Sequence, residues 1–174
     1  MSKINYPLEK IRGIVFDVDG VLSPTVVPLG DDGIPRRMAN LKDGYAIVQA
    51  VKHGLKIAVI TGAVAPGLAE RFAICGVTDF FAGKLEKLEI LEKWMVDNGL
   101  KPEEVAYAGD DIPDVEPMRH VGLAVAPADA SRDALEVADY VADSRGGYGV
   151  GREIIEEVMR ARGIWPTQSE AFGS

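Results

Sequence analysis

The chain has 174 residues, of which 47% are hydrophobic and 26% charged, and it carries a net charge of −8. Such a chain fits one globular domain over residues 1–174, and its acidity argues against a general nucleic-acid-binding protein. No apolar run approaches the roughly 18 residues of a membrane span, and the N-terminus lacks a signal-peptide pattern. The single cysteine, Cys75, excludes an internal disulfide and fits a reducing compartment. We therefore expect a cytoplasmic protein with no membrane partner.

The first predicted element is a buried central strand at 11–16, a short run rich in β-branched residues. Asp17 and Asp19 follow it, and Gly20 allows a sharp turn. Open α/β sheets bind ligands beyond the carboxyl ends of their strands. Two carboxylates there can share a divalent metal, or divide nucleophilic and acid/base work between them. The alternative is an ordinary acidic turn, and this pair alone does not decide between the two.

A segment rich in proline and glycine follows at 24–40, with the strong turn signal Gly-Asp-Asp-Gly at 30–33. We expect a β-hairpin that projects over the end of the sheet as a flap. The next helix is predicted at 45–53, with Asp43 as its N-cap and Gly54 at its end.

A second buried strand is predicted at 56–60, and Thr61 stands at its carboxyl end. A hydroxyl there can bond a phosphate oxygen, although Thr-Gly is also a common turn dipeptide. A helix over 66–74 carries Arg71, and Cys75 at its end is interpreted as a packing residue.

A short strand at 77–81 precedes a helix at 88–98. The core face of this helix is indicated by apolar residues at helical spacing: Leu85, Leu88, Leu91 and Met95. Trp94 is expected to pack on the same face. Lys87 lies just before this helix, and taken by itself it is better interpreted as a solvated lysine than as a site residue.

Three carboxylates crowd the end of a fourth strand, predicted at 105–108. Asp110, Asp111 and Asp114 lie within five residues and repel one another unless a cation or N–H groups compensate. This crowding favours a metal site.

The remaining segments continue the alternation of strands and helices, with strands at 122–126 and 139–142, a helix at 132–137 capped by Ser131, and a last helix at 152–162. This pattern predicts a doubly wound, three-layer α/β sandwich with a mainly parallel sheet. The loop at 146–149 and the tail at 163–174 are expected to be flexible. The tail carries Trp165 and Phe172, so it is either disordered or docked on an apolar surface.

The separate signals share one location, because the carboxyl ends of parallel strands meet at one edge of a sheet. That edge gathers carboxylates, a hydroxyl and an ammonium group: Asp17, Asp19, Thr61, Lys87, Asp110 and Asp111. Phosphoryl transfer needs this combination, since the charge on the equatorial oxygens must be neutralised by a hard cation and a lysine.

These motifs, in this order, resemble the haloacid dehalogenase superfamily of phosphatases: Asp-x-Asp-Gly at 17–20, Thr61, Lys87 and Gly-Asp-Asp-x-x-Asp at 109–114. The residues at 40–45, 146–149 and 152–153 resemble its 3-deoxy-D-manno-octulosonate 8-phosphate (KDO 8-phosphate) phosphatase branch, which acts in lipopolysaccharide precursor biosynthesis. The likeness runs from about 11 to 162. No segment between the motifs is long enough for an inserted cap domain beyond its own helix and hairpin, so we expect a capless enzyme.

The resemblance implies a role for each site residue. Asp17 attacks phosphorus and forms an aspartyl-phosphate, and Asp19 protonates the leaving hydroxyl and then deprotonates water. Thr61 and Lys87 bind the phosphate. Mg²⁺ is held by Asp17, the main-chain carbonyl of Asp19, and Asp110.

Further residues are assigned by the same resemblance. Asp111 or Asp114 orients the metal shell or Lys87. Residues expected to contact the sugar phosphate are Asn40, Lys42, Asp43, Gly44 and Arg71.

Two positions depart from this branch. Its members often carry a basic or acidic residue where this chain has Ala63, and often a basic residue where it has Val48. The substrate is therefore KDO 8-phosphate or a related nine-carbon keto sugar acid 9-phosphate. The missing charge would come from Arg36, from Arg37, or from Arg145 of a neighbouring subunit. A non-catalytic, phosphatase-like subunit is the third alternative, and the presence of Asp17, Asp19 and Lys87 weighs against it.

The resemblance also implies a homotetramer. A capless subunit leaves its phosphate site open to water, so the flap at 24–40 and a neighbour's tail are expected to help close it.

Overall fold

The computed structural model describes residues 1–83 and 86–170. A six-stranded sheet lies at the centre, all of its paired strands are parallel, and their order is β3-β2-β1-β4-β5-β6. The strands are β1 (Gly13–Phe16), β2 (Lys56–Thr61), β3 (Asp79–Ala82), β4 (Val105–Ala108), β5 (Leu123–Ala126) and β6 (Tyr140–Val141). The order reverses at β1, which is the place where open α/β sheets form a ligand crevice.

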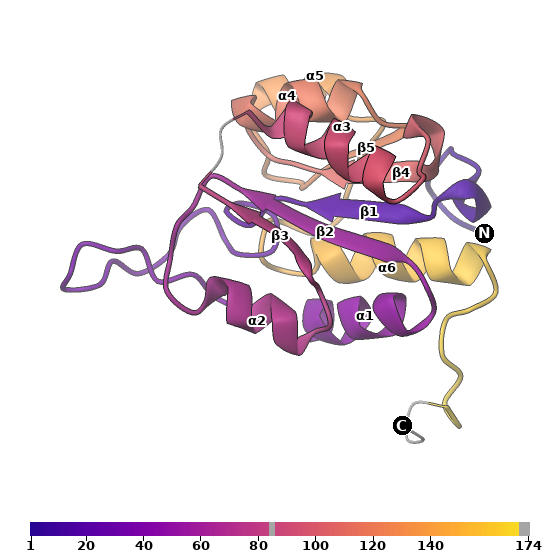
Figure 1. Cartoon of the computed structure of the whole chain (residues 1–174), viewed down its shortest axis with the longest axis horizontal. Helices are drawn as coiled ribbons and strands as arrows, with labels where there is room; N and C mark the ends of the chain where they lie inside the picture. The colour runs from indigo at the N-terminus through magenta and orange to yellow at the C-terminus, as the bar shows by residue number, and fades with distance from the viewer. Residues whose placement is uncertain (84–85, 171–174) are drawn as a thin grey trace.

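Helices cover both faces of the sheet (Figure 1). One face carries α1 (Leu41–Lys52), α2 (Leu68–Ile74) and α6 (Val150–Ala161), and the other carries α3 (Lys87–Asp97), α4 (Ile112–Arg119) and α5 (Arg132–Val137). Two 3₁₀ turns, η1 (Leu8–Lys10) and η2 (Pro102–Glu104), precede β1 and β4. The predicted three-layer, doubly wound fold is confirmed.

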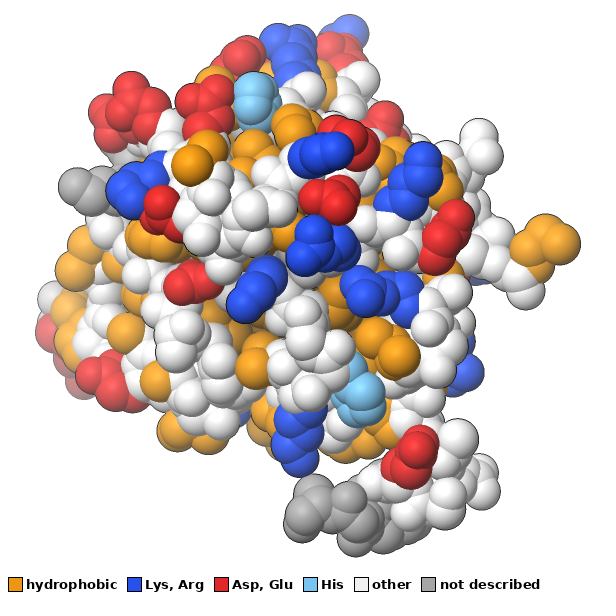
Figure 2. Space-filling model, turned by 45° about the vertical axis from the view of Figure 1, so that its right-hand side comes forward, with side chains coloured by type: hydrophobic (Ala, Val, Ile, Leu, Met, Phe, Trp, Pro, Cys, Tyr) orange, Lys and Arg blue, Asp and Glu red, His pale blue; other side chains and the backbone are white. Residues whose placement is uncertain are grey.

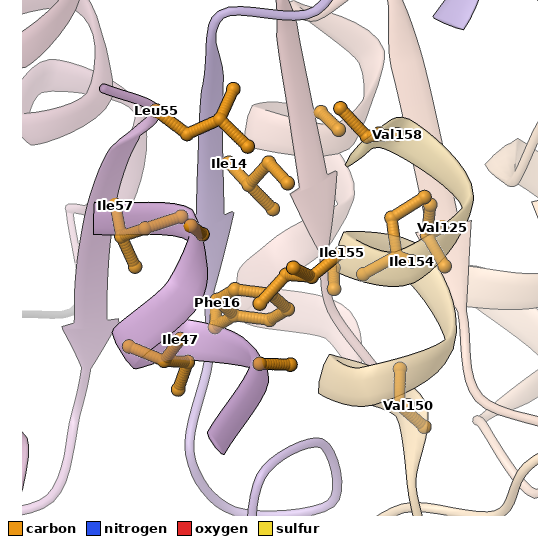
Figure 3. Packing of buried hydrophobic residues seen from close by; sticks show 14 of the residues in the cluster. Ile14, Phe16, Ile47, Leu55, Ile57, Val125, Val150, Ile154, Ile155 and Val158 are labelled. Carbon is orange, nitrogen blue, oxygen red and sulfur yellow. The ribbon is translucent and has the colours of Figure 1, made fainter. Parts of the chain in front are cut away.

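The two faces of the sheet build two hydrophobic cores, because successive side chains of a strand point in opposite directions. Ile14 and Phe16 of β1 join the core beneath α1 and α6, which Figure 3 shows together with Ile47 and Ile155. Val15 faces the opposite core. The expected core face of α3 is confirmed at Leu91, Trp94 and Met95, with Leu88 at its margin, whereas Leu85 lies outside the described residues. Cys75 is buried, as predicted for a packing residue.

The start of α1 differs from the prediction. The helix begins at Leu41 rather than Tyr45, and its N-cap is Asn40 rather than Asp43. The Oδ1 atom of Asn40 accepts hydrogen bonds from the backbone N–H groups of Lys42 at 2.9 Å and of Asp43 at 3.1 Å. Asn40 therefore satisfies the free donors of the first turn, and the side chain of Asp43 remains available for another element.

The segment at 24–40 projects from the edge at which the strands end (Figure 1). Leu29 and Pro35 form a single antiparallel bridge, and the N–H groups of Gly30 and Arg36 donate to Ile34 and Pro28 across the turn. The predicted turn is present, but no regular strand forms on either side of it. The prolines explain this, because they lack the N–H group that a strand ladder needs.

The tail after α6 packs partly on its own chain. Trp165 is half buried; its ring lies 6.3 Å from the ring of Tyr45, and the guanidinium of Arg152 lies 4.7 Å above it. Trp165 is thus partly covered within the subunit by Tyr45 of α1 and Arg152 of α6. Phe172 lies outside the described residues.

On the face drawn in Figure 2, basic side chains gather near the middle, with acidic side chains among and around them. The net charge of −8 is therefore not spread over this face as a uniform acidic surface. Among the described residues, no helix is both long and apolar enough to cross a membrane.

Candidate active site

Four predicted site residues meet at the carboxyl edge of the three central strands. Asp17 directly follows β1, Thr61 ends β2, and Asp110 comes two residues after β4. Lys87, the first residue of α3, reaches in from beyond β3. They converge because β1 lies between β2 and β4, so the segments leaving these strands emerge side by side.

The buried ammonium group of Lys87 joins two carboxylates. Its Nζ atom lies 3.1 Å from Oδ2 of Asp17 and 2.8 Å from Oδ1 of Asp114. Burial lowers the pKa of Lys87, but the Asp114 and Asp17 carboxylates together outweigh it, so this pKa lies above its usual value of 10.5. Lys87 is thus buried and charged, which contradicts the alternative of a solvated lysine; its role in binding phosphate stays a prediction.

Asp114 is fully buried and organises this cluster. Its Oδ1 atom also accepts a hydrogen bond from the Tyr107 hydroxyl at 2.8 Å, and its Oδ2 atom accepts one from the backbone N–H of Asp110 at 3.0 Å. Both oxygens are therefore engaged, which places Asp114 behind the site, where it holds Lys87 and the Asp110 backbone. The part played by Tyr107 was missed, because in the sequence it is one residue of an apolar strand.

Carboxylate oxygens of Asp17, Asp110 and Asp114 lie within 4.8 Å of one another, as a metal site requires. Burial and the Asp114 charge raise the pKa of Asp17 well above its usual value of 3.8, although Lys87 opposes the shift. Burial, Asp114 and Asp111 raise the pKa of Asp110 to about 7. A bound cation reverses such shifts. Since Asp114 is engaged elsewhere, Asp17 and Asp110 are the side chains that fit a hard divalent cation.

Gly20 lets Asp110 approach the loop after β1. Its φ angle is +79°, and a Cβ atom at this position would lie 1.9 Å from Oδ2 of Asp110. Only glycine combines this backbone conformation with such a close approach. The predicted sharp turn thus also leaves room for the carboxylate.

Asp19 lies at the mouth of the site and is held by an arginine of the projecting segment. Nε of Arg37 lies 2.9 Å from one carboxylate oxygen of Asp19, and Nη2 lies 2.9 Å from the other. The side chain of Asp19 is 49% exposed and that of Arg37 is 15% exposed. No sequence pattern predicted this pairing between residues 18 positions apart.

Thr61 and Asp111 make their described hydrogen bonds outside the Asp17–Lys87–Asp114 cluster. Thr61 is buried at the end of β2, where its hydroxyl oxygen accepts a hydrogen bond from the backbone N–H of Ala63 at 3.1 Å. Asp111 is exposed, and its carboxylate accepts a hydrogen bond from the backbone N–H of Ile112 at the start of α4. The described contacts therefore bring Asp114, and not Asp111, to Lys87.

A cavity of about 280 Å³ lies between the projecting segment, α1 and α2. The cavity is lined by four of the residues expected to contact the sugar phosphate: Asn40, Asp43, Gly44 and Arg71. The fifth, Lys42, is exposed and is not part of the cavity wall. A Cβ atom on Gly44 would lie 2.6 Å from Nη2 of Arg71, so glycine allows this guanidinium to lie against α1.

Asp43 joins the cavity wall to α6. Its Oδ1 atom accepts a hydrogen bond from the backbone N–H of Arg152 at 2.8 Å, while its buried Oδ2 atom has no hydrogen-bond partner among the described residues. Gly149, the N-cap residue of α6, supplies no capping side chain. Asp43 therefore caps a different helix from the one predicted. Burial raises its pKa to about 6, although the backbone N–H groups of Arg152 and Gly151 oppose the shift.

The glycine loop at 146–149 packs against the loop that follows β1. A Cβ atom on Gly146 would lie 2.0 Å from the Gly20 carbonyl oxygen, and one on Gly147 would lie 2.3 Å from Pro24. The side-chain amide of Asn40 also donates to the Gly147 carbonyl at 3.1 Å. Glycines are required here because the two loops touch along their backbones.

The fold and the site together define a haloacid dehalogenase-like hydrolase. The parallel sheet has its switch point at β1, and the Asp17–Lys87–Asp114 cluster lies at that point with Asp110 beside it. A family model of that description matches residues 75–154. The curated 3-deoxy-D-manno-octulosonate 8-phosphate phosphatase of Escherichia coli is 38% identical over 155 residues, which cover 89% of this chain and 82% of that protein. The Yersinia pestis protein of the same name is 36% identical over 152 residues, covering 87% and 81%.

Solved structures agree. The phosphatase of this name from Yersinia pestis superposes with a TM-score of 0.86 at 35% identity, covering 90% of this chain and 85% of that one. The Moraxella catarrhalis phosphatase, crystallised with magnesium, phosphate and KDO, gives 0.85 at 26% identity and covers 90% of both chains. The chain belongs to the 3-deoxy-D-manno-octulosonate 8-phosphate phosphatase family of haloacid dehalogenase-like hydrolases.

Proposed function

We propose that this protein is a Mg²⁺-dependent phosphatase that hydrolyses KDO 8-phosphate to KDO and phosphate, a step in lipopolysaccharide precursor biosynthesis. The observation that carries the proposal is the buried Asp17–Lys87–Asp114 cluster at the end of β1, with Asp110 beside it. The similarity to relatives of that name supports the choice of sugar acid.

In this proposal Asp17 is the nucleophile. One of its oxygens attacks phosphorus, the bond from phosphorus to the sugar oxygen breaks, and that oxygen takes a proton from Asp19. Water then attacks the aspartyl-phosphate and gives a proton to Asp19, and the bond from phosphorus to Asp17 breaks. Asp17 and Asp19 are thereby restored.

The other site residues bind and position. Thr61 and Lys87 bind the phosphate oxygens, and Asp114 keeps Lys87 charged and directed at Asp17. Asp17, Asp110 and the Asp19 main-chain carbonyl would hold Mg²⁺, which supplies positive charge to the phosphoryl oxygens when bound.

The sugar is proposed to occupy the cavity between the projecting segment, α1 and α2. Arg71 reaches this cavity and has no carboxylate within 4 Å in the part of the chain that the structure describes, so it can receive the acid group of the substrate. Asn40, Asp43 and Gly44 also line this cavity. The exposed Lys42 would reach the substrate only at the cavity rim.

Phosphate release from KDO 8-phosphate tests the chemistry, with the nine-carbon keto acid 9-phosphate assayed beside it. Asp17→Asn should abolish turnover, since an amide is no nucleophile, and EDTA should stop the wild-type reaction until Mg²⁺ is added. Asp97→Asn is the matched control, because this exposed residue pairs with Lys93 near the C-terminal end of α3, whereas Lys87 lies at the start of that helix. Turnover by Asp17→Asn at the wild-type rate would exclude the assignment.

We also propose that the protein is a cytoplasmic homotetramer. Val26, Leu29 and Met38 of the projecting segment are exposed apolar residues, and the same segment of a second subunit could cover them. Sedimentation should give four times the chain mass, 18.7 kDa. A fully active monomer would refute this proposal.

A further inference from the structure

Glu153 lies near the start of α6 and binds the chain that leaves β6. Its Oε1 atom accepts hydrogen bonds from the Tyr140 hydroxyl at 2.6 Å and from the backbone N–H of Asp143 at 2.9 Å. Its Oε2 atom accepts one from the backbone N–H of Ser144 at 3.0 Å. A carboxylate suits this position, because both of its oxygens accept and neither donates. Glu153 therefore fixes the approach to the glycine loop at 146–149.

The glycine loop in turn binds the residue that caps α1. The Gly147 carbonyl accepts a hydrogen bond from the side-chain amide of Asn40 at 3.1 Å, and the N–H of Gly147 donates to the Val21 carbonyl at 2.8 Å. The Oδ1 atom of Asn40 is already bound by the N–H groups of Lys42 and Asp43. The amide of Asn40 is thus held at both ends, and its second N–H remains for a sugar hydroxyl.

A further hydrogen bond closes these contacts into a ring. Asp43 of α1 accepts the backbone N–H of Arg152, which directly precedes Glu153 in α6. The start of α1 is therefore tied to the start of α6 twice: directly through Asp43, and indirectly through the glycine loop and Asn40. Since Asn40, Asp43 and Gly44 line the cavity of about 280 Å³, the ring fixes the part of the cavity wall that α1 supplies.

We propose that Glu153 is a positioning residue for the sugar part of the substrate. Glu153 does not line the cavity itself, and it acts through the glycine loop, whose Gly147 carbonyl orients the amide of Asn40. The carboxylate of one helix thereby sets the geometry of the binding wall on another. This inference rests on the proposed phosphatase function and adds a residue that takes no part in the chemistry.

Glu153→Ala removes both acceptor oxygens from the approach to the loop. The loop should shift rather than unfold, because Oδ1 of Asp129 still accepts a hydrogen bond from the Gly146 N–H at 2.8 Å. The KM for KDO 8-phosphate should rise about 3- to 10-fold, the effect of weakening one hydrogen bond to the sugar, with kcat nearly unchanged. The KM for p-nitrophenyl phosphate, which carries no sugar, should not change. Glu153→Gln, which exchanges one acceptor oxygen for a donor, should give a smaller rise.

Two variants separate positioning from stability. Tyr140→Phe removes one hydrogen bond of Glu153 but leaves those to the backbone of Asp143 and Ser144, so it should lower the stability to urea without raising the KM for KDO 8-phosphate. Glu116→Ala, at an exposed ion pair with Arg119, should change neither quantity. An unchanged KM for KDO 8-phosphate in Glu153→Ala, or the same change for both phosphates, would overturn the inference. If Glu153→Ala does not fold, the same criteria apply to Glu153→Gln.

Calorimetric binding of KDO keeps this inference distinct from the proposed function. A wild-type protein inert toward both phosphates would refute the phosphatase function. Weaker binding of KDO to the Glu153 variant than to the wild type would still support the positioning role, because binding needs no turnover. Equal binding of KDO to both proteins, or binding to neither, would overturn that role.

Discussion

Replacing Asp43 by asparagine should remove a specific part of the pH dependence of the protein's stability. Asp43 is 3% exposed, and within residues 1–83 and 86–170 its buried Oδ2 atom has no hydrogen-bond partner. Burial raises the pKa of this carboxyl to about 6, from an ordinary value of 3.8 that the unfolded chain retains. The folded protein therefore binds a proton more tightly than the unfolded chain, and stability from this group is present below pH 3.8 and is lost as the pH rises through 6.

The size of the effect follows from the shift. At about 1.36 kcal/mol for each pKa unit, ionising Asp43 in the folded protein costs about 3 kcal/mol at pH 7.5. The linkage relation places about 2 kcal/mol of this cost between pH 4.5 and 7.5. Asparagine keeps the acceptor for the backbone N–H of Arg152 and does not ionise, so the variant lacks this loss.

Urea unfolding of both proteins at several values from pH 4.5 to 7.5 measures the difference. The free energy of unfolding of Asp43→Asn minus that of the wild type should rise with pH by about 2 kcal/mol, whatever constant offset the new amide introduces. Asp97→Asn, at an exposed ion pair, is the control and should give a nearly flat difference. A flat difference for Asp43→Asn would refute the reasoning, because it would mean that the carboxyl is not perturbed by burial.

Two further substitutions test the site. Gly20→Ala should weaken metal binding, because the new Cβ would lie 1.9 Å from Oδ2 of Asp110 at a φ of +79°. Titration of phosphate release with Mg²⁺ should show that the variant needs a higher Mg²⁺ concentration, and an unchanged Mg²⁺ requirement would contradict the close approach. Tyr107→Phe removes the hydroxyl that donates to Asp114 at 2.8 Å inside the core; urea unfolding should show a loss of about 1–3 kcal/mol, and a variant as stable as the wild type would show that this bond contributes nothing.

The sequence alone determined the order of strands and helices and the location of the main site residues at one edge of the sheet. Asp17, Thr61, Lys87 and Asp110 come directly at or after strand ends, or at the start of a helix that follows one. Parallel strands linked by right-handed crossovers place all such positions on one edge. No knowledge of side-chain contacts is needed for that conclusion. The family motifs then added an expected chemistry to the same positions.

Only the tertiary structure decided which partner each group has. Arg37 reaches Asp19 because the projecting segment turns back over the strand ends, and Asp43 caps α6 because α1 and α6 pack side by side on one face. Tyr107 meets Asp114 because its strand position directs the hydroxyl toward the start of α4. A sequence pattern reports periodicity and turn preference within a short window. The direction of a side chain across a packed interface depends on atoms far away in the chain, so these contacts had no local signal.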